Sequence, residues 1–267
     1  MEDGWSALAG QWSELWAASA APAHEALIAA SGIRGGSRVL DVGCGSGEFL
    51  RTLADRGAVA AGIDPARGMV ALARNVAPLA DIRVGEAERL PWPDGSFDVV
   101  TAVNALQFAD DTLDALAEFT RVLAPGGLVA VANWAEGSRN DLDAIEAAVA
   151  AADGTTPASA SADAEEGDAD ADAEEGDAPS DGDLRAAGGL EAVLGEAGLE
   201  VVAAGLVAVP WFAADADTLV RGVLLGEDPS LLRELAPVVL AAARPFRVGD
   251  GYLLNNAYRY VVARGPF

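Results

Sequence analysis

The chain has 267 residues, of which 51% are hydrophobic, and 42 acidic against 17 basic residues give a formal net charge of −25. This excess disfavours binding to nucleic acids or anionic membranes through a general positive field, because those partners need positive charge. With one cysteine, Cys44, and one histidine, His24, the chain can form no intrachain disulfide and no cysteine or histidine cluster, so no metal site is expected.

The N-terminal segment is acidic and lacks the charged-then-apolar design of a secretory signal. No run of about 18 apolar residues occurs, so no transmembrane helix is predicted. A cytoplasmic protein is therefore expected. The first element predicted is a helical stretch from Trp5 to about Ile33, broken near Pro22.

The next part of the chain alternates between two kinds of segment. Strand-like runs fall at 38–42, 58–63, 81–84, 97–103 and 128–133. Amphipathic or alanine-rich helical stretches lie between them, at 48–56, 66–76 and 112–123. This alternation predicts a parallel sheet covered on both faces. The sequence APGG at 124–127 predicts a helix stop and a turn into the fifth strand.

An acidic segment, residues 153–183, interrupts the pattern. It holds twelve acidic residues and no basic ones, so about half of the net charge lies in it, and the sequence DAEEGDA occurs in it twice. It contains no Val, Ile, Leu or aromatic residue. Such a composition cannot bury enough apolar surface to offset the entropy of ordering, which predicts a disordered insertion.

Beyond the insertion, a helix is predicted at 184–197 and a strand at 199–209. Two helices follow at 215–225 and 230–243, and a final strand covers 256–264. The most economical architecture is one domain with seven strands.

The strongest local signal is VLDVGCGSG at 39–47, an apolar strand that leads into a glycine-rich turn, with a helix from about Glu48. Glycines permit positive φ and close approach of backbone to a ligand. The N–H groups of such a turn, with the helix N-terminus, favour an anionic group such as a carboxylate or phosphate. In an open α/β sheet the ligand crevice lies at this end of the strands.

Two ligand classes fit this turn to different degrees. A dinucleotide fingerprint, G-x-G-x-x-G/A, is matched by Gly43 and Gly45, but its third position falls on Glu48, whose carboxylate opposes close packing and a pyrophosphate. The other pattern is an acid two residues before G-x-G-x-G, and Asp41 followed by Gly43, Gly45 and Gly47 satisfies it. Here the sequence resembles class I S-adenosylmethionine-dependent methyltransferases of the bacterial small-molecule type.

Further motifs extend this resemblance over residues 37–133. GIDP at 62–65 places an acid at the end of the second strand, and VGEAERLPW at 84–92 resembles the stretch after the third. FDVV at 97–100, NALQF at 104–108 and RVLAPGG at 121–127 match the fourth strand, its end and the turn before the fifth. The likeness is weaker over 188–267, and the acidic insertion is outside the shared pattern.

The resemblance implies a Rossmann-like α/β fold, with a seven-stranded, mostly parallel sheet, helices on both faces and an antiparallel last strand. It divides one methyltransferase domain, 1–267, into a helical cap (1–36), a cofactor-binding half (37–135), the acidic insertion (153–183) and a substrate-side half (184–267). It also implies transfer of a methyl group from S-adenosyl-L-methionine to a small-molecule acceptor by in-line displacement, catalysed mainly by positioning.

The resemblance assigns roles to particular residues. Asp64 is expected to hold the ribose, Glu86 the adenine amine, and Asp41 the ammonium of the amino-acid end. The full set of cofactor-binding residues implied is Asp41, Gly43, Cys44, Gly45, Gly47, Asp64, Pro65, Met69, Glu86, Ala87, Asn104 and Gln107. His24 is the candidate base. The candidate contacts of an apolar or aromatic acceptor are Trp12, Trp16, Trp211, Tyr252 and Tyr258.

Other interpretations stay open at this stage. Met69 could be ordinary core, and Asn104 and Gln107 could be ordinary loop residues. The protein could also bind the cofactor without turnover, since a fold does not fix a function. A nicotinamide-dependent oxidoreductase is the less favoured alternative because of Glu48.

Overall fold

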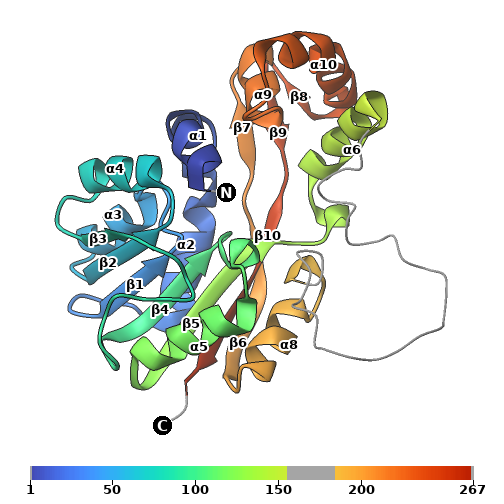
Figure 1. Cartoon of the computed structure of the whole chain (residues 1–267). Coiled ribbons are helices and arrows are strands. Elements are labelled where there is room, and N and C mark those ends of the chain that lie inside the picture. The colour runs from blue at the N-terminus through green and yellow to red at the C-terminus, as the bar shows by residue number, and fades with distance from the viewer. Residues whose placement is uncertain (1, 155–183, 266–267) are drawn as a thin grey trace, which may run out of the picture.

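The computed structural model describes residues 2–154 and 184–265, so residues 155–183 of the predicted insertion lie outside the described part. A seven-stranded sheet runs through the molecule in the order β3-β2-β1-β4-β5-β10-β6 (Figure 1). Its strands are β1 (Arg38–Val42), β2 (Val59–Asp64), β3 (Asp81–Val84), β4 (Phe97–Val103), β5 (Leu123–Trp134), β6 (Glu200–Ala208) and β10 (Ala257–Arg264).

Strand direction follows the predicted topology. β1 pairs in parallel with β2 and β4, β2 with β3, and β4 with β5. β10 is antiparallel to both of its neighbours, β5 and β6. The prediction of a mostly parallel, seven-stranded sheet with an antiparallel last strand is confirmed. Its carboxyl edge gathers the ends of β1, β2, β4 and β5 in one place.

Helices cover both faces of the sheet because each presents an apolar stripe to it. On one face, α2 (Ala21–Ser31), α3 (Glu48–Asp55) and α4 (Arg67–Val76) bury side chains such as Leu27, Leu50 and Val70 against the strands. On the other, α5 (Thr112–Val122) and α8 (Gly189–Glu196) bury Phe119 and Leu194. The two hydrophobic clusters sandwich the sheet.

A second layer stands beyond the carboxyl edge; two of its helices match those predicted at 215–225 and 230–243, but its small sheet and its third helix were not predicted. It comprises a three-stranded sheet in the order β7-β9-β8 together with three helices (Figure 1). Its elements are α6 (Asp141–Asp153), β7 (Trp211–Ala213), α9 (Ala216–Val223), α10 (Pro229–Ala242), β8 (Arg247–Val248) and β9 (Gly251–Leu254). The helix α1 (Glu2–Leu15) lies beside this layer and contacts α4 and α9.

Three sequence expectations are wrong in detail. The N-terminal helix breaks at Trp16, between α1 and the short helix η1 (Ala17–Ala20), and Pro22 lies in the first turn of α2, where its missing N–H needs no partner. The helix predicted from residue 184 is regular only from Gly189. Instead of a turn before the fifth strand, residues 124–127 form its irregular start, since Leu123 already pairs with Phe97.

The start of α6 is fixed by a buried asparagine. Asn140 donates from Nδ2 to the Ala135 carbonyl at 2.7 Å, and its Oδ1 accepts from the Ala257 N–H at 2.9 Å. Asn256 Oδ1 accepts from the Leu142 N–H at 3.2 Å. These bonds join α6 to the turn between β9 and β10.

Asn140→Ala is expected to lower the free energy of unfolding by about 2 kcal/mol, because it leaves the Ala257 N–H without its acceptor and removes the hydrogen bond to the Ala135 carbonyl. Urea denaturation measures the loss. Asn75→Ala, at an exposed position of α4, is the control and should change stability by less than about 0.5 kcal/mol. Equal losses in the two variants would show that the Asn140 bonds do not hold α6.

Within residues 2–154 and 184–265, no helix combines the length and apolar character needed to cross a bilayer.

Candidate active site

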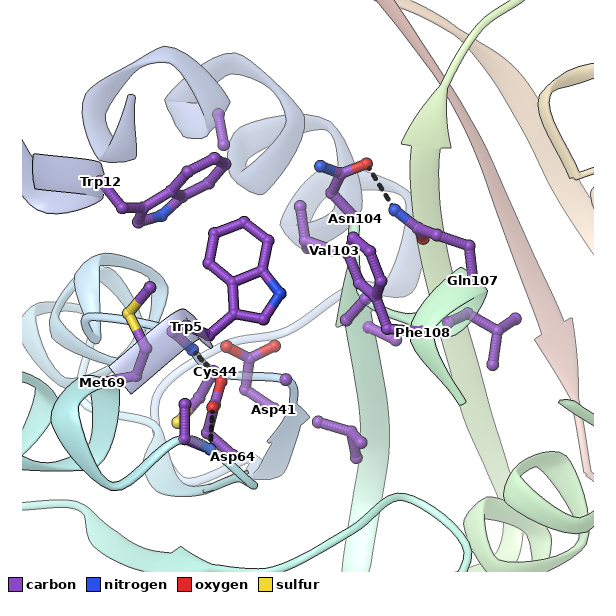
Figure 2. Close-up of a pocket in the computed structure, with 18 of the residues that line it drawn as sticks. Trp5, Trp12, Asp41, Cys44, Asp64, Met69, Val103, Asn104, Gln107 and Phe108 are labelled. Carbon is purple, nitrogen blue, oxygen red and sulfur yellow. Dashed lines mark hydrogen bonds between the residues drawn. The ribbon is translucent and has the colours of Figure 1, made fainter. Parts of the chain in front are cut away.

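A cavity of about 930 Å³ opens at the carboxyl edge of the large sheet. This volume lies at the upper end of the range for ligand pockets, about 300–1,000 Å³. The ends of β1, β2 and β4 form one side of it, and α1, α2, α6 and α9 contribute to the rest. Figure 2 shows the side lined by the strand ends.

The glycine-rich turn after β1 forms the floor. Gly43, Gly45 and Gly47 have φ of 68°, 51° and 95°, which L side chains rarely adopt. A Cβ on Gly43 would collide with Ala105, and one on Gly47 would lie 2.7 Å from the Ala73 Cα of α4. The turn therefore needs glycine for its conformation and for close packing.

Four backbone N–H groups of this turn already have protein acceptors. Those of Gly43 and Cys44 both donate to the Ile63 carbonyl, at 2.9 and 3.0 Å. The Gly45 N–H donates to Asp64 Oδ2 at 2.9 Å, and that of Gly47 to the Cys44 carbonyl at 3.1 Å. These bonds hold the turn in shape, in place of the ligand contacts that the sequence suggested for these four amides.

Asp64 ends β2 and faces the turn. Its Oδ1 accepts from the Ala66 N–H at 2.9 Å, and its Oδ2 accepts from the Gly45 N–H (Figure 2). Each carboxylate oxygen keeps a further lone pair, so Asp64 can still accept two hydrogen bonds from a ligand. Burial raises the pKa of this carboxyl, although the two backbone hydrogen bonds oppose that shift.

Asp41, on β1, is 3% exposed and accepts a hydrogen bond from Thr101 Oγ1 at 2.8 Å. Burial raises the pKa of Asp41 to about 7; the Thr101 bond works against this shift and the charge of Asp64 adds to it. A cation placed in the cavity would therefore ionise Asp41 near neutral pH.

The remaining predicted cofactor residues line the same side. Pro65 and Met69 follow β2, and Met69 packs on Ala66 and Ala9 of α1. Glu86 and Ala87 follow β3. The Cys44 thiol is buried beneath the turn, and burial raises its pKa well above the usual range, so it stays protonated. A nucleophilic role for Cys44 is thereby disfavoured.

The residues that follow β4 line the cavity next to the glycine-rich turn. Asn104, with φ of 51°, is the one non-glycine residue of positive φ in the described chain, a conformation that Asn tolerates. Its Oδ1 accepts from Gln107 Nε2 at 3.1 Å (Figure 2). Gln107 Oε1 is buried and has no partner among the described groups. This orphaned acceptor points to a donor supplied by a ligand.

Aromatic side chains from α1 extend over this region. Trp5 packs edge-on against Trp12 at 5.4 Å and against Phe108 at 5.9 Å between ring centroids. In Figure 2 the Trp5 ring lies between Trp12 and the Asp41 side of the cavity. Sequence reasoning gave neither residue a role in the site: Trp5 belongs to no motif, and Phe108 ends the motif NALQF at 104–108 but was not among the predicted contacts.

His24 lies on α2, lines the cavity and stacks on Phe49 with 4.4 Å between ring centroids. Burial lowers the pKa of His24 to about 4, so the imidazole is neutral at pH 7 and is a weak base. Its assignment as the base stays a prediction.

His24 is expected to make the protein less stable in acid. Its pKa is depressed on folding from 6.5 to about 4, so its contribution is present above pH 6.5 and is lost as the pH falls towards 4. Linkage gives a loss of about 2 kcal/mol between pH 7 and pH 5. His24→Phe keeps a ring against Phe49 without a titrating group. Urea denaturation of both proteins at pH 7 and pH 5 measures this effect, and the stability that His24→Phe loses between the two pH values should be smaller than the wild-type loss by about 2 kcal/mol. An equal loss in the two proteins would show that the depressed pKa of His24 does not cause the acid sensitivity.

The acceptor candidates separate into two groups. Trp12, Trp16 and Tyr258 line the cavity, together with Trp134. Trp211 and Tyr252 do not line it and pack in the hydrophobic cluster beside it. The Trp16 and Trp211 rings stack at 4.2 Å; Trp16 Nε1 donates to the Gly222 carbonyl and Trp211 Nε1 to the Leu15 carbonyl. Trp211 thus packs against Trp16 on the side of that ring away from the cavity and does not contact the cavity itself.

Sequence reasoning also missed a polar group on the far wall. Asp143 and Glu146 of α6 and Arg185 line the cavity. No motif marks them, and α6 itself was not predicted. With them, the described cavity wall contains one permanent cation, Arg185, and eight acidic residues: Asp41, Glu48, Asp64, Glu86, Glu88, Asp110, Asp143 and Glu146. The cavity therefore favours cationic over anionic ligands.

Comparison with known proteins agrees with this geometry. Residues 40–131, from β1 to β5, match the family described as "Methyltransferase domain". A malonyl-[acyl-carrier protein] O-methyltransferase of Serratia marcescens is 34% identical over 118 residues, 44% of this chain and 46% of that protein. A demethylmenaquinone methyltransferase of Beutenbergia cavernae is 39% identical over 111 residues, 42% of this chain and 46% of that protein. The chain thus spans about half the length of the curated relatives it matches.

Solved structures share the fold over nearly the whole chain. A SAM-dependent methyltransferase from Aquifex aeolicus superposes with a TM-score of 0.53 at 16% identity, covering 96% of this chain and 97% of that one. The [4+2]-cyclase SpnF superposes with a TM-score of 0.56 at 21% identity, covering 91% and 80%.

The fold and the strand-end site define a class I, Rossmann-like methyltransferase architecture. Residues 40–131, about a third of the chain, match the methyltransferase-domain family, and this match together with the fold implies S-adenosyl-L-methionine as the cofactor.

Proposed function

We propose that the protein transfers a methyl group from S-adenosyl-L-methionine to a small-molecule acceptor by in-line displacement. The observation that carries this proposal is the cavity at the ends of β1, β2 and β4, where Asp64 and Asp41 lie beside the glycine turn and Gln107, with its orphaned oxygen, lines the part beyond β4. A cytoplasmic location and the single-domain division of the chain belong to the same proposal.

The residues present fit this cofactor. A ribose diol needs paired acceptors, and Asp64 retains lone pairs for them. An ammonium needs acceptors, which Gln107 Oε1 and Asp41 supply. A sulfonium needs an anionic surrounding, and the described wall carries eight acids against one arginine. Met69, Glu86 and Ala87 remain the proposed contacts of the adenine.

When bound, the cofactor supplies an activated methyl group on a positively charged sulfur. The protein's own part is positioning, which can contribute about 7–11 kcal/mol of barrier reduction. Asp64 and the glycine turn would fix one reactant, while Trp12, Trp16, Trp134 and Tyr258 would hold the apolar body of the other. Trp5 and Phe108 would exclude water between α1 and the end of β4.

Titration calorimetry with S-adenosylmethionine and with S-adenosylhomocysteine tests the proposal. Binding of both is expected, and no binding at about 1 mM would refute it. The cyclase among the fold's neighbours shows that this architecture also hosts other chemistry. Binding without methyl transfer to any member of a broad acceptor panel would therefore favour a non-catalytic binding protein. Binding of a reduced nicotinamide cofactor instead would favour an oxidoreductase.

A further inference from the structure

The far wall of the cavity carries a polar cluster that cofactor binding does not use. Asp143 and Glu146 lie three residues apart on α6 and hence on one face of the helix. Asp143 Oδ2 accepts from Arg185 Nη2 at 2.6 Å, and both side chains are 13% exposed. Arg185 also donates to the Ala135 carbonyl, from Nε at 3.2 Å and from Nη2 at 3.1 Å. The arginine is thus engaged by protein acceptors.

This cluster lies on the side of the cavity away from the glycine turn. α6 follows β5, which is separated from β1 by β4 in the sheet order. Neighbouring strands are about 4.8 Å apart, so the ends of β1 and β5 are separated by about 10 Å, roughly the width of a small ligand. Figure 1 shows α6 on the opposite side of the carboxyl edge from α3 and α4. When a ligand is bound at the glycine turn, the α6 side of the cavity therefore remains open for the methyl acceptor.

The backbone that carries Glu146 is held in place. Asn140 and Asn256 fix the first turn of α6, and Asp141 Oδ2 accepts from the Asn255 N–H at 2.7 Å. Ile145, beside Glu146, is fully buried. A carboxyl on such a helix can hold a fixed direction towards a ligand.

The charges in this cluster favour one kind of acceptor. Arg185 and Asp143 offset each other, so Glu146 supplies the remaining charge. Burial raises the pKa of Glu146 to about 7; the charge of Asp143 adds to this shift, and that of Arg185 opposes it. A carboxylate of that basicity accepts a proton better at neutral pH than an ordinary one, and better than His24.

Other charged groups lie on the elements packed against α6. Those of α10, α9 and the short helix η3 (Gly137–Arg139) are exposed or paired with partners on the outside of the molecule. They are Arg233, Glu234, Asp217, Arg221 (paired with Glu14 and Asp217) and Arg139 (paired with Glu136). Asp143 and Arg185 are the charges that act on Glu146.

We propose that Glu146 selects the methyl acceptor: it accepts the hydrogen bond and then the proton of a hydroxyl or amine nucleophile on a flat apolar body, and it excludes free carboxylate nucleophiles. This inference rests on the proposed function. The acceptor's oxygen or nitrogen forms a bond to the methyl carbon while the carbon–sulfur bond breaks and its electron pair stays on sulfur. The proton released from the acceptor moves to a Glu146 oxygen and from there to solvent.

Three probes that share a naphthalene body test the proposal: 2-naphthol, 2-naphthylmethylamine and 2-naphthoate. Calorimetry on the full chain saturated with S-adenosylhomocysteine gives their dissociation constants at about pH 6 and about pH 8, on either side of the titration of Glu146. At the higher pH, the naphthol and the amine are expected to bind at least about tenfold more tightly than the naphthoate, as a hydrogen bond to a charged group provides. In Glu146→Gln this preference and its pH dependence should disappear, while binding of S-adenosylhomocysteine is unchanged.

Glu234→Gln, the same change at an exposed position of α10, is the matched control and should behave as the wild type. The proposal is overturned if the naphthoate binds as tightly as the two donors, if neither donor binds, or if Glu146→Gln keeps the preference. Failure of S-adenosylhomocysteine itself to bind is a separate result, because it removes the proposed function first. If only one of the two donors, the naphthol or the amine, binds more tightly than the naphthoate, the proposal holds and the acceptor is assigned to that class, hydroxyl or amine.

Discussion

Asp64→Ala is expected to weaken binding of S-adenosylmethionine by about a hundredfold or more. Two hydrogen bonds from ribose hydroxyls to an ionised carboxylate contribute about 1.5–3 kcal/mol each, and both are lost with the side chain. The variant also leaves the N–H groups of Gly45 and Ala66 without their acceptor, which loosens the glycine turn. Titration calorimetry gives the affinity directly.

Two controls separate ligand contact from damage to the turn. Asp55→Ala removes the same charge from an exposed position of α3 and should leave the affinity within about twofold. Thermal denaturation of Asp64→Ala shows whether the fold itself is retained. An affinity equal to that of the wild type in a folded Asp64→Ala would remove Asp64 from the ribose role.

Gly47→Ala is expected to lower the free energy of unfolding by about 4 kcal/mol. At φ of 95° an alanine is strained, which costs about 1–2 kcal/mol. Its Cβ would also lie 2.7 Å from the Cα of Ala73, and a backbone atom of a packed helix cannot move aside as a flexible side chain can. Overpacking of that kind costs about 1–3 kcal/mol more. Urea denaturation with an unchanged slope would measure the sum.

Gly45→Ala is the matched control in the same turn. Gly45 also has positive φ, at 51°, but a Cβ there meets no atom within 4 Å. It should therefore cost only the conformational strain, about 1 kcal/mol. Equal losses for the two alanines would show that the approach of α4 to the turn does not decide the need for Gly47.

The large sheet could be predicted from sequence because its signals are local. Apolar runs such as 97–103 are long enough to mark buried parallel strands, and β1, β3 and β4 begin and end where expected. Asp41, Asp64 and the three glycines could be placed for the same reason: each lies at the end of a strand or directly after it, and the strand fixes its position. The carboxyl ends of parallel strands lie at the same edge of the sheet, whatever the length or conformation of the segments that connect them.

In the second layer, the helices α9 and α10 could be predicted, but the small sheet, α6 and the way these parts pack could not, because they depend on contacts far apart in sequence. The strands of the β7-β9-β8 sheet have two to four residues each, which is too short for an alternating pattern. α6 is rich in alanine and directly precedes the acidic segment, so no pattern separates it from a linker. The ion pair of Asp143 and Arg185 joins residues 42 positions apart, and no sequence pattern predicts a pair at that separation.

Two hydrogen bonds donated by indole N–H groups join the end of α1 to the second layer, and they affect the order in which the protein folds during synthesis. Trp16 reaches Gly222 and Trp211 reaches Leu15, so groups about 200 positions apart secure each other. During synthesis, α1 leaves the ribosome long before its partners exist, and contacts of such separation form late. The large sheet can assemble from β1 to β5 while translation continues, but the wall that α1 contributes waits for the last third of the chain. A nascent chain stalled before residue 211 lacks β10 and is therefore expected to hold only the paired strands β3-β2-β1-β4-β5, with an unfinished cavity.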